Sequence, residues 1–383
     1  MIVRTVVAAT VVLGLILQPL TASAQTMSAL PTPGGQFQIG TTTWHLIDAD
    51  RMDPLVGATP RELMVSVFYP ATDTAGRPSA PLLSTQVLPH LEQALGVQIP
   101  VLQSHSVSDA PVASGRFPVI VYSPGRAMPR TLATGAAEEL ASRGYIVVSI
   151  DHTYESLCVE FPDGRLVQNT PIPASDTTQQ LYLDTRLADS KFVLDTLDTV
   201  RDGNDPDAEK HPLPTGLGEA LDLTRIGMFG QSLGGYTAVE MLRTDPRISA
   251  VVDLDGGINI GDTLGTAAQT GISKPILLIT SSDGLEDQQA TPSWTALFDH
   301  STGWKHELTV QNSAHNDFTD LPVLLPGPIP MPTGHYFIGP IAGPRIDTIT
   351  RTYLAAFFDH FLRDTPNTLL DHLTDFPEVQ TLR

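Results

Sequence analysis

The five residues Gly230-Gln231-Ser232-Leu233-Gly234 constrain the fold of this chain more than any other feature, because of what surrounds them. Residues 225–229 are short and apolar enough to form a buried strand, and residues 235–242 have the spacing of a helix. A serine between glycines in a tight strand-to-helix turn is typical of a nucleophile elbow, where a Cβ at either glycine would collide with a neighbouring element. An ordinary glycine-rich turn is the alternative, but the flanking pattern favours Ser232 as a nucleophile.

The rest of the chain alternates strand-like and helix-like segments. This pattern predicts an α/β fold with a mostly parallel central sheet and helices on both faces. An antiparallel pair at one edge of the sheet is expected from residues 41–47 and 62–69. The expected central strands are residues 118–122, 145–150, 225–229, 250–254, 275–279 and 305–310, and the expected helices are residues 130–143, 176–199, 292–299 and 346–362.

Two segments interrupt this alternation. Residues 202–222 are polar and acidic with several prolines and glycines, which predicts a loop insertion before the elbow strand. Residues 320–345 hold seven prolines among apolar residues, so no regular element is expected there. The apolar side chains of this second segment, Leu324 and Leu325 among them, either pack on the core as a rigid loop or line a binding pocket or lipid contact. Neither loop marks a domain boundary, and residues 25–383 are expected to form one domain.

The first 24 residues resemble a targeting segment rather than part of the fold. Arg4 is their only charge, residues 6–20 are apolar, and Ala22-Ser23-Ala24 is a small-residue cleavage signal. This composition predicts a secretory signal peptide over residues 1–24, and therefore a secreted protein. The single cysteine, Cys158, allows no intramolecular disulfide, so the stability of the fold must come from a large core.

The net charge and the motifs limit the partners and cofactors that this chain is expected to bind. The formal net charge is −20 and no basic cluster is present, which argues against nucleic acid as a partner. The sequence contains no phosphate-binding loop and no dinucleotide fingerprint, so no cofactor is expected. Asp48, Asp50 and Asp53 have a loosely calcium-like spacing but lack the remaining ligands, and a solvated turn is the preferred interpretation, with no metal site expected.

A serine nucleophile needs a base and an acid that orients the base. In this topology the acid and then the histidine follow the serine along the chain, each after a strand. His315 lies five residues after Val310, the end of the last central strand, and is the predicted base, whereas His335 lies farther into the proline-rich segment. Two acids remain open, Asp255 after the strand that follows the elbow unit and Asp283 after the next strand, which is the commoner position.

These residues together resemble a known family. The elbow, Asp255 and the run Ser313-Ala314-His315-Asn316-Asp317-Phe318 are similar to the type II and plasma platelet-activating factor acetylhydrolases and their secreted bacterial relatives. The resemblance extends to residues 63–70, 117–125 and 186–194 and covers most of residues 40–365. It implies the α/β-hydrolase fold and places the acid at Asp255 rather than Asp283.

The resemblance also implies an oxyanion hole. One donor would be the backbone N–H of Leu233, the residue after the nucleophile, and the other would be the backbone N–H of Arg126. The family usually has histidine where this chain has Pro124, which has no N–H to donate.

The expected activity is that of a secreted serine esterase that hydrolyses short-acyl carboxylic esters through an acyl-enzyme, similar to 1-alkyl-2-acetylglycerophosphocholine esterases. A small ester or lipid is the expected substrate, with transient contact to a lipid surface and no obligate protein partner. A lipase or polyester hydrolase, a peptidase on the same fold and a non-catalytic binding protein are the alternatives. A dienelactone hydrolase would normally have cysteine at position 232.

Overall fold

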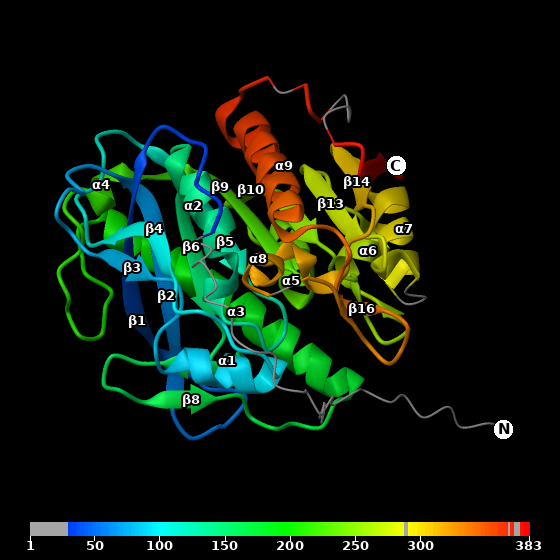
Figure 1. The fold of residues 1–383 in the computed structure, drawn as a ribbon. Helices are drawn as coiled ribbons and strands as arrows, with labels where there is room; N and C mark the ends of the chain where they lie inside the picture. Colours follow the sequence, from blue (N-terminus) through cyan, green and yellow to red (C-terminus); the bar gives the residue numbers. More distant parts are fainter. Residues whose placement is uncertain (1–29, 287–289, 326, 367, 371–375) are drawn as a thin grey trace, which may run out of the picture.

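The computed structural model describes residues 30–286, 290–325, 327–366, 368–370 and 376–383. The expected signal peptide, residues 1–24, lies outside the described residues. Among the residues described, an eleven-stranded sheet crosses the molecule, with helices on both faces (Figure 1). Its strand order is β17 (Val379–Thr381), β14 (Lys305–Val310), β13 (Ile276–Ser281), β10 (Ile248–Leu254), β9 (Leu221–Gln231), β5 (Phe117–Ser123), β6 (Ile146–Asp151), β2 (Pro60–Ala71), β1 (Gln38–Met52), β4 (Gln103–Ser108) and β3 (Ser79–Pro81).

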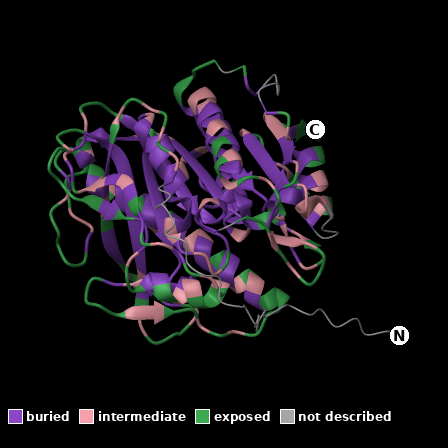
Figure 2. Ribbon diagram, in the orientation of Figure 1, coloured by how far each residue is buried: buried purple, intermediate pink, exposed green. Residues whose placement is uncertain are grey.

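The centre of the sheet is parallel from β6 through β5, β9, β10 and β13 to β14. These strands read as continuous apolar runs because helices cover both faces of a parallel sheet. Figure 2 shows the central strands buried along their length, while the exposed residues lie in the loops and on the outer sides of the helices. The expected α/β-hydrolase architecture is confirmed.

The helices form two layers. Val119 and Val121 of β5 point into the cluster covered by α3 to α7, whereas Ile120 and Tyr122 point into the cluster covered by α2 and α9. This alternation follows from the period of two residues along a strand. The helices are α1 (Val87–Leu95), α2 (Thr134–Ser142), α3 (Asp176–Arg201), α4 (Leu217–Ala220), α5 (Leu233–Thr244), α6 (Thr266–Thr270), α7 (Ala290–His300), α8 (Leu321–Leu324) and α9 (Gly343–Arg363). No helix in the described part of the chain has the length and apolar character needed to cross a membrane.

The expected antiparallel pair exists as β1 and β2, but it is not the edge of the sheet. Strand β4 pairs with β1, and β3 pairs with β4 outside it. At the opposite edge, β17 pairs with β14 in antiparallel orientation. These edge strands are short, and β4 is almost wholly polar, so no apolar pattern marks them in the sequence.

The proline-rich segment contains more regular structure than expected. It holds α8, a hairpin of β15 (Ile329–Pro330) and β16 (Tyr336–Ile338), and the start of α9. The expectation of no regular element was wrong because Pro322 and Pro344 lie in the first turns of helices, where the missing N–H has no intrahelical acceptor. The other expected loop, residues 202–222, contains α4 and the first residues of β9.

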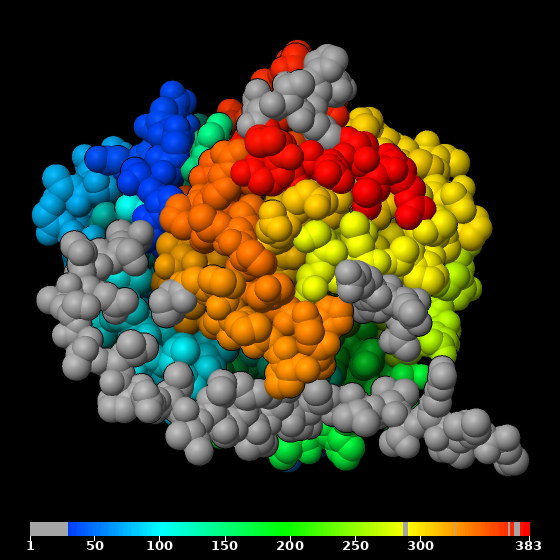
Figure 3. All heavy atoms as spheres, turned by 45° about the vertical axis from the view of Figure 1, so that its right-hand side comes forward, coloured from blue at the N-terminus to red at the C-terminus, as the bar shows by residue number. Residues whose placement is uncertain are grey.

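Leu324 and Leu325 are buried in a third apolar cluster, together with residues of α1. Of the two interpretations open for this segment, the structure therefore favours a loop packed on the protein for these two side chains. In the space-filling view the segment, in orange, lies across the middle of one face (Figure 3).

Candidate active site

Ser232 lies between β9 and α5 in a strained conformation, with φ 58° and ψ −126°. A positive φ is uncommon for a residue with a side chain and is maintained only when the surroundings enforce it. A Cβ on Gly230 would lie 2.2 Å from the backbone carbon of Gly234, and a Cβ on Gly234 would lie 1.9 Å from the carbonyl oxygen of Ser123. Both glycines are therefore required for the tight turn that presents Ser232.

His315 and Asp255 are in contact. His315 begins a short 3-10 helix (His315–Phe318) after β14, and its Nδ1 lies 2.8 Å from Oδ2 of Asp255. Asp255 follows β10 and also accepts hydrogen bonds from Ser281, at 2.7 Å from the backbone N–H and 2.8 Å from the hydroxyl. Because Ser281 holds both carboxylate oxygens, Asp255 is fixed in orientation toward the imidazole.

The elbow is tied to the strand ends on either side. The N–H of Ser232 donates to the carbonyl of Leu254 at 2.9 Å, one residue before Asp255. The side-chain amide of Gln231 donates to the carbonyl of His315 at 2.8 Å. Gln231 was missed as a functional residue in the sequence, although a polar residue at the end of a buried strand was the available signal. The structure thus brings Ser232, Asp255 and His315 to the carboxyl-terminal ends of the parallel strands.

The second acid and the second histidine pair with each other. Asp283 follows β13, and its Oδ1 lies 3.0 Å from Nδ1 of His335, while its Oδ2 accepts from the N–H of Tyr336 at 3.0 Å. Asp283 therefore anchors the β15–β16 hairpin. Asp317 also holds this hairpin, through hydrogen bonds from Ala314 and Gly339, and burial raises its pKa to about 6.

The two predicted oxyanion donors lie beside the serine. Leu233 is the first residue of α5, where an N–H has no intrahelical acceptor. Gly125, the residue before Arg126, passes so close that a Cβ on it would lie 3.3 Å from the Cβ of Ser232. The carbonyl of Gly125 accepts a hydrogen bond of 3.2 Å from Arg186. Since the peptide is planar and trans, the N–H of Arg126 points away from Arg186.

A buried polar network supports this loop from behind. Arg186 of α3 is buried, forms an ion pair of 2.7 Å with Glu155, and also donates to the Ser123 hydroxyl and the Pro124 carbonyl. The Ser123 hydroxyl lies 3.0 Å from Nε2 of His152. Three consecutive loop residues are therefore held by one guanidinium.

The network continues to the first strands. Nδ1 of His152 lies 2.9 Å from Asp189, which pairs with Arg61 at 2.6 Å. Burial lowers the pKa of His152. Burial would raise the pKa of Asp189, but the charges and hydrogen bonds of Arg61 and His152 together outweigh it and hold that pKa below its usual range. The sequence resemblance included Arg186 and Asp189, but their contacts depend on residues far apart in the chain.

Potential metal ligands lie away from this site. Within the described ranges, Asp207, Glu209 and His211 have ligand atoms within 4.8 Å of one another. His211 Nδ1 lies 2.8 Å from Asp207, and Glu209 lies 2.9 Å from Nδ1 of His45 on β1, so each of the three groups already has a protein partner. Asp53, from the calcium-like run, instead accepts from Arg61 at 2.7 Å and caps its own turn.

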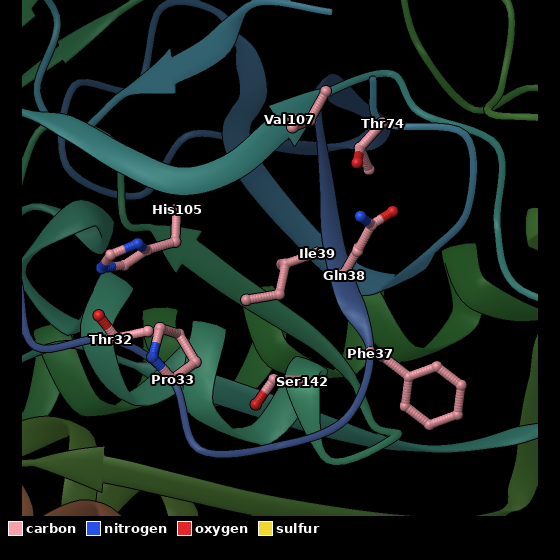
Figure 4. A pocket seen from close by; sticks show the side chains of 9 residues that line it. All are labelled: Thr32, Pro33, Phe37, Gln38, Ile39, Thr74, His105, Val107 and Ser142. Atoms are coloured by element: carbon pink, nitrogen blue, oxygen red, sulfur yellow. The ribbon is translucent and has the colours of Figure 1, made fainter. Parts of the chain in front are cut away.

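A hollow of about 270 Å³ lies near the start of β1 (Figure 4). Its lining includes Gln38 and Ile39, which pair with the end of β2, beyond the start of β6. The hollow therefore lies at the amino-terminal ends of the parallel strands, whereas Ser232 lies at their carboxyl-terminal ends. Its full lining is Thr32, Pro33, Phe37, Gln38, Ile39, Thr74, His105, Val107 and Ser142.

Comparison with known proteins identifies the family of this chain. The sequence profile of the family described as platelet-activating factor acetylhydrolase, isoform II, matches residues 22–331. The chain belongs to this family. A relative from Arthroderma benhamiae, a probable 1-alkyl-2-acetylglycerophosphocholine esterase, is 26% identical over 345 residues, which cover 82% of each chain. The platelet-activating factor acetylhydrolase of Cavia porcellus is 21% identical over 323 residues, covering 76% of this chain and 69% of its own.

A solved structure is also similar. The ferulic acid esterase from Streptomyces cinnamoneus superposes with a TM-score of 0.78 at 34% identity, covering 93% of this chain and 99% of the other. The resemblance inferred from the sequence is therefore confirmed, together with the α/β-hydrolase fold. As a member of the platelet-activating factor acetylhydrolase family with this neighbour, the protein is a carboxylic ester hydrolase.

Proposed function

We propose that this family member is a secreted serine esterase that hydrolyses short-acyl esters with Ser232, His315 and Asp255 as its catalytic triad. The observation that supports this most strongly is the 2.8 Å hydrogen bond between His315 Nδ1 and Asp255. This pair lies at the same carboxyl-terminal ends of the parallel strands as the strained elbow serine. That hydrogen bond leaves Nε2 of His315 as the nitrogen for the serine proton.

The reaction follows from these positions. Ser232 Oγ attacks the ester carbonyl and transfers its proton to His315, while Asp255 stabilises the imidazolium. The N–H groups of Leu233 and Arg126 receive the negative charge that develops on the carbonyl oxygen, and each donor contributes roughly 3 kcal/mol. His315 then protonates the departing alcohol. A water molecule, deprotonated by His315, cleaves the acyl-enzyme and restores Ser232.

The relatives support an ester substrate, but their names give different acyl groups. One is named as an esterase of an acetylated phospholipid and the other as an esterase of ferulic acid. We therefore propose a small ester or a lipid ester as substrate, without nucleic acid or an obligate protein partner, and with transient contact to a lipid surface.

An acyl-length series of p-nitrophenyl esters tests this proposal, with Ser232→Ala as the control. The proposal predicts the highest kcat/KM on acetate or butyrate and no turnover of a peptide anilide. A preference for long acyl chains or insoluble polyester would instead favour a lipase or polyester hydrolase. Turnover of the anilide would favour a peptidase, and no Ser232-dependent turnover of any compound would favour a binding protein.

A further inference from the structure

Arg126 differs from the other cationic residues of this protein. Its side chain is exposed, and it forms no hydrogen bond or ion pair with any described residue. Every other arginine and lysine in the described ranges donates to a carboxylate or a backbone carbonyl, including exposed ones such as Arg77 and Lys210. With 42 acidic residues against 22 basic ones, a cation without a partner is unusual in this chain.

The position of Arg126 gives this free charge a role. Its backbone adjoins Gly125, which contacts both Ser232 and Gln231 of the elbow, so the side chain leaves the protein beside the nucleophile. Burial raises the pKa of Tyr182 on α3 and the positive charge of Arg126 opposes that rise, which places the guanidinium near the same helix. Glu155, whose charge also acts on Tyr182, is already paired with Arg186.

The overall charge of the molecule makes such a cation consequential. A net charge of −20 repels anionic compounds at long range, so an anionic ester needs a local positive group to stay bound near Ser232. A guanidinium offers a planar pair of N–H donors that matches a carboxylate or a phosphate. Because this group is already solvated and unpaired, it can bind an anion without first breaking an internal ion pair.

We propose that the Arg126 side chain binds an anionic group, a carboxylate or a phosphate, carried by the ester substrate. The inference rests on the proposed esterase function and adds the class of ester that is preferred. It is separable from the oxyanion hole, because the oxyanion donor is the backbone N–H of Arg126, which persists when the side chain is replaced.

The test compares matched anionic and neutral esters. With the charge on the alcohol side, 4-acetoxybenzoate and 4-acetoxyphenyl phosphate are compared with methyl 4-acetoxybenzoate. With the charge on the acyl side, mono-(4-nitrophenyl) glutarate is compared with 4-nitrophenyl pentanoate. The ratio of wild-type kcat/KM to variant kcat/KM is taken for each compound, which cancels the intrinsic reactivity of the ester.

We expect Arg126→Gln to lower kcat/KM on at least one anionic ester by about tenfold or more beyond any change on its neutral partner, mainly through KM. Arg126→Lys should retain most of the preference. Added salt should raise KM on the anionic ester for the wild type and much less for Arg126→Gln. The anionic ester whose kcat/KM falls shows whether Arg126 binds a carboxylate or a phosphate, and whether that group lies on the acyl or the alcohol side of the ester.

Equal changes on the anionic and neutral esters, or no change on any of them, would overturn the inference while leaving the esterase function intact. The neutral esters report on that function separately, through turnover that disappears in Ser232→Ala. If the wild type hydrolyses none of the neutral esters, the proposed function fails and this inference fails with it. A circular dichroism spectrum and a melting curve of each variant show that it is folded.

Discussion

Asp283 pairs with His335, at 3.0 Å between Oδ1 and Nδ1, and not with His315. The two acids that the sequence left in competition are thus divided between two histidines, since Asp255 lies 2.8 Å from Nδ1 of His315. One pair lies at the strained elbow, and the other holds a hairpin. This division predicts different consequences for the two carboxylates.

Replacing Asp255 with asparagine should reduce esterase kcat by about 10⁴, because the amide favours the wrong tautomer of His315. Asp283→Asn keeps a partner for His335 and should cost less than about tenfold. Steady-state kinetics on p-nitrophenyl acetate measures both. A larger loss for Asp283→Asn than for Asp255→Asn would assign the acid to the commoner position after β13.

Much of the fold was predictable because buried strands have a distinct composition. The expected strand at residues 305–310 has the same bounds as β14, and the elbow strand and its helix lie where the apolar pattern placed them. The edge strands were missed because their pairing depends on partners far away in sequence. The polar strand β4 contacts β1, which is more than fifty residues earlier in the chain.

The candidate site was predictable in its residues but not in its support. Ser232, His315 and Asp255 follow from the motif, the chain order and the family resemblance. Gln231 and Arg186 act through contacts that only the fold creates, such as the bond from Arg186 to a carbonyl 61 residues away. The prolines at 322 and 344 hid α8 and the first turn of α9, because proline stops a helix in its interior and not in its first turn.

Arg186 should be a positioning residue for the oxyanion hole. The double variant Arg186→Met/Glu155→Gln leaves no unpaired charge, and we expect its kcat to fall by about 10² with little change in KM, because the Arg126 N–H is no longer aimed at the substrate. Binding of a trifluoromethyl ketone, whose adduct places an oxyanion in the hole, should weaken in proportion.

Arg351→Met is the matched control. Arg351 is also buried, but it donates to Asp347 and to the Pro31 carbonyl, away from the loop. This variant should lower the melting temperature and leave kcat unchanged. If the Arg186→Met/Glu155→Gln variant loses only stability and retains both kcat and affinity for the ketone, the role of Arg186 is structural.

Asp320 should make stability depend on pH. The Asp320 carboxylate accepts a hydrogen bond from the N–H of Gly135 at the start of α2. Burial, only partly offset by the positive charge of Arg351, raises the pKa of Asp320 from 3.8 to about 7. A folded-state pKa above the unfolded value means that the associated stability is present below about pH 4 and is lost as the pH rises to about 7. Asp320→Asn should therefore gain stability relative to the wild type between pH 4 and pH 8, by roughly 2 to 4 kcal/mol.

Urea unfolding of both proteins at pH 4, 6 and 8 measures this change, and the difference between them cancels the contributions of other groups. Asp317, whose pKa burial raises to about 6, does not act on Asp320 and contributes to both proteins alike. Asp347 does act on Asp320, so its interaction with Asp320 is part of the measured difference. A difference in unfolding free energy that is constant from pH 4 to pH 8 would contradict the assignment to Asp320.

The most direct test of the account is the site of covalent labelling by a fluorophosphonate, followed by mass spectrometry of the digested protein. We predict one adduct per chain, on the peptide that contains Ser232, formed in step with the loss of esterase activity and absent from Ser232→Ala. Labelling should slow by several orders of magnitude in His315→Gln, because the serine then lacks its base. An adduct on any other residue, or full esterase activity in Ser232→Ala, would contradict the proposed triad.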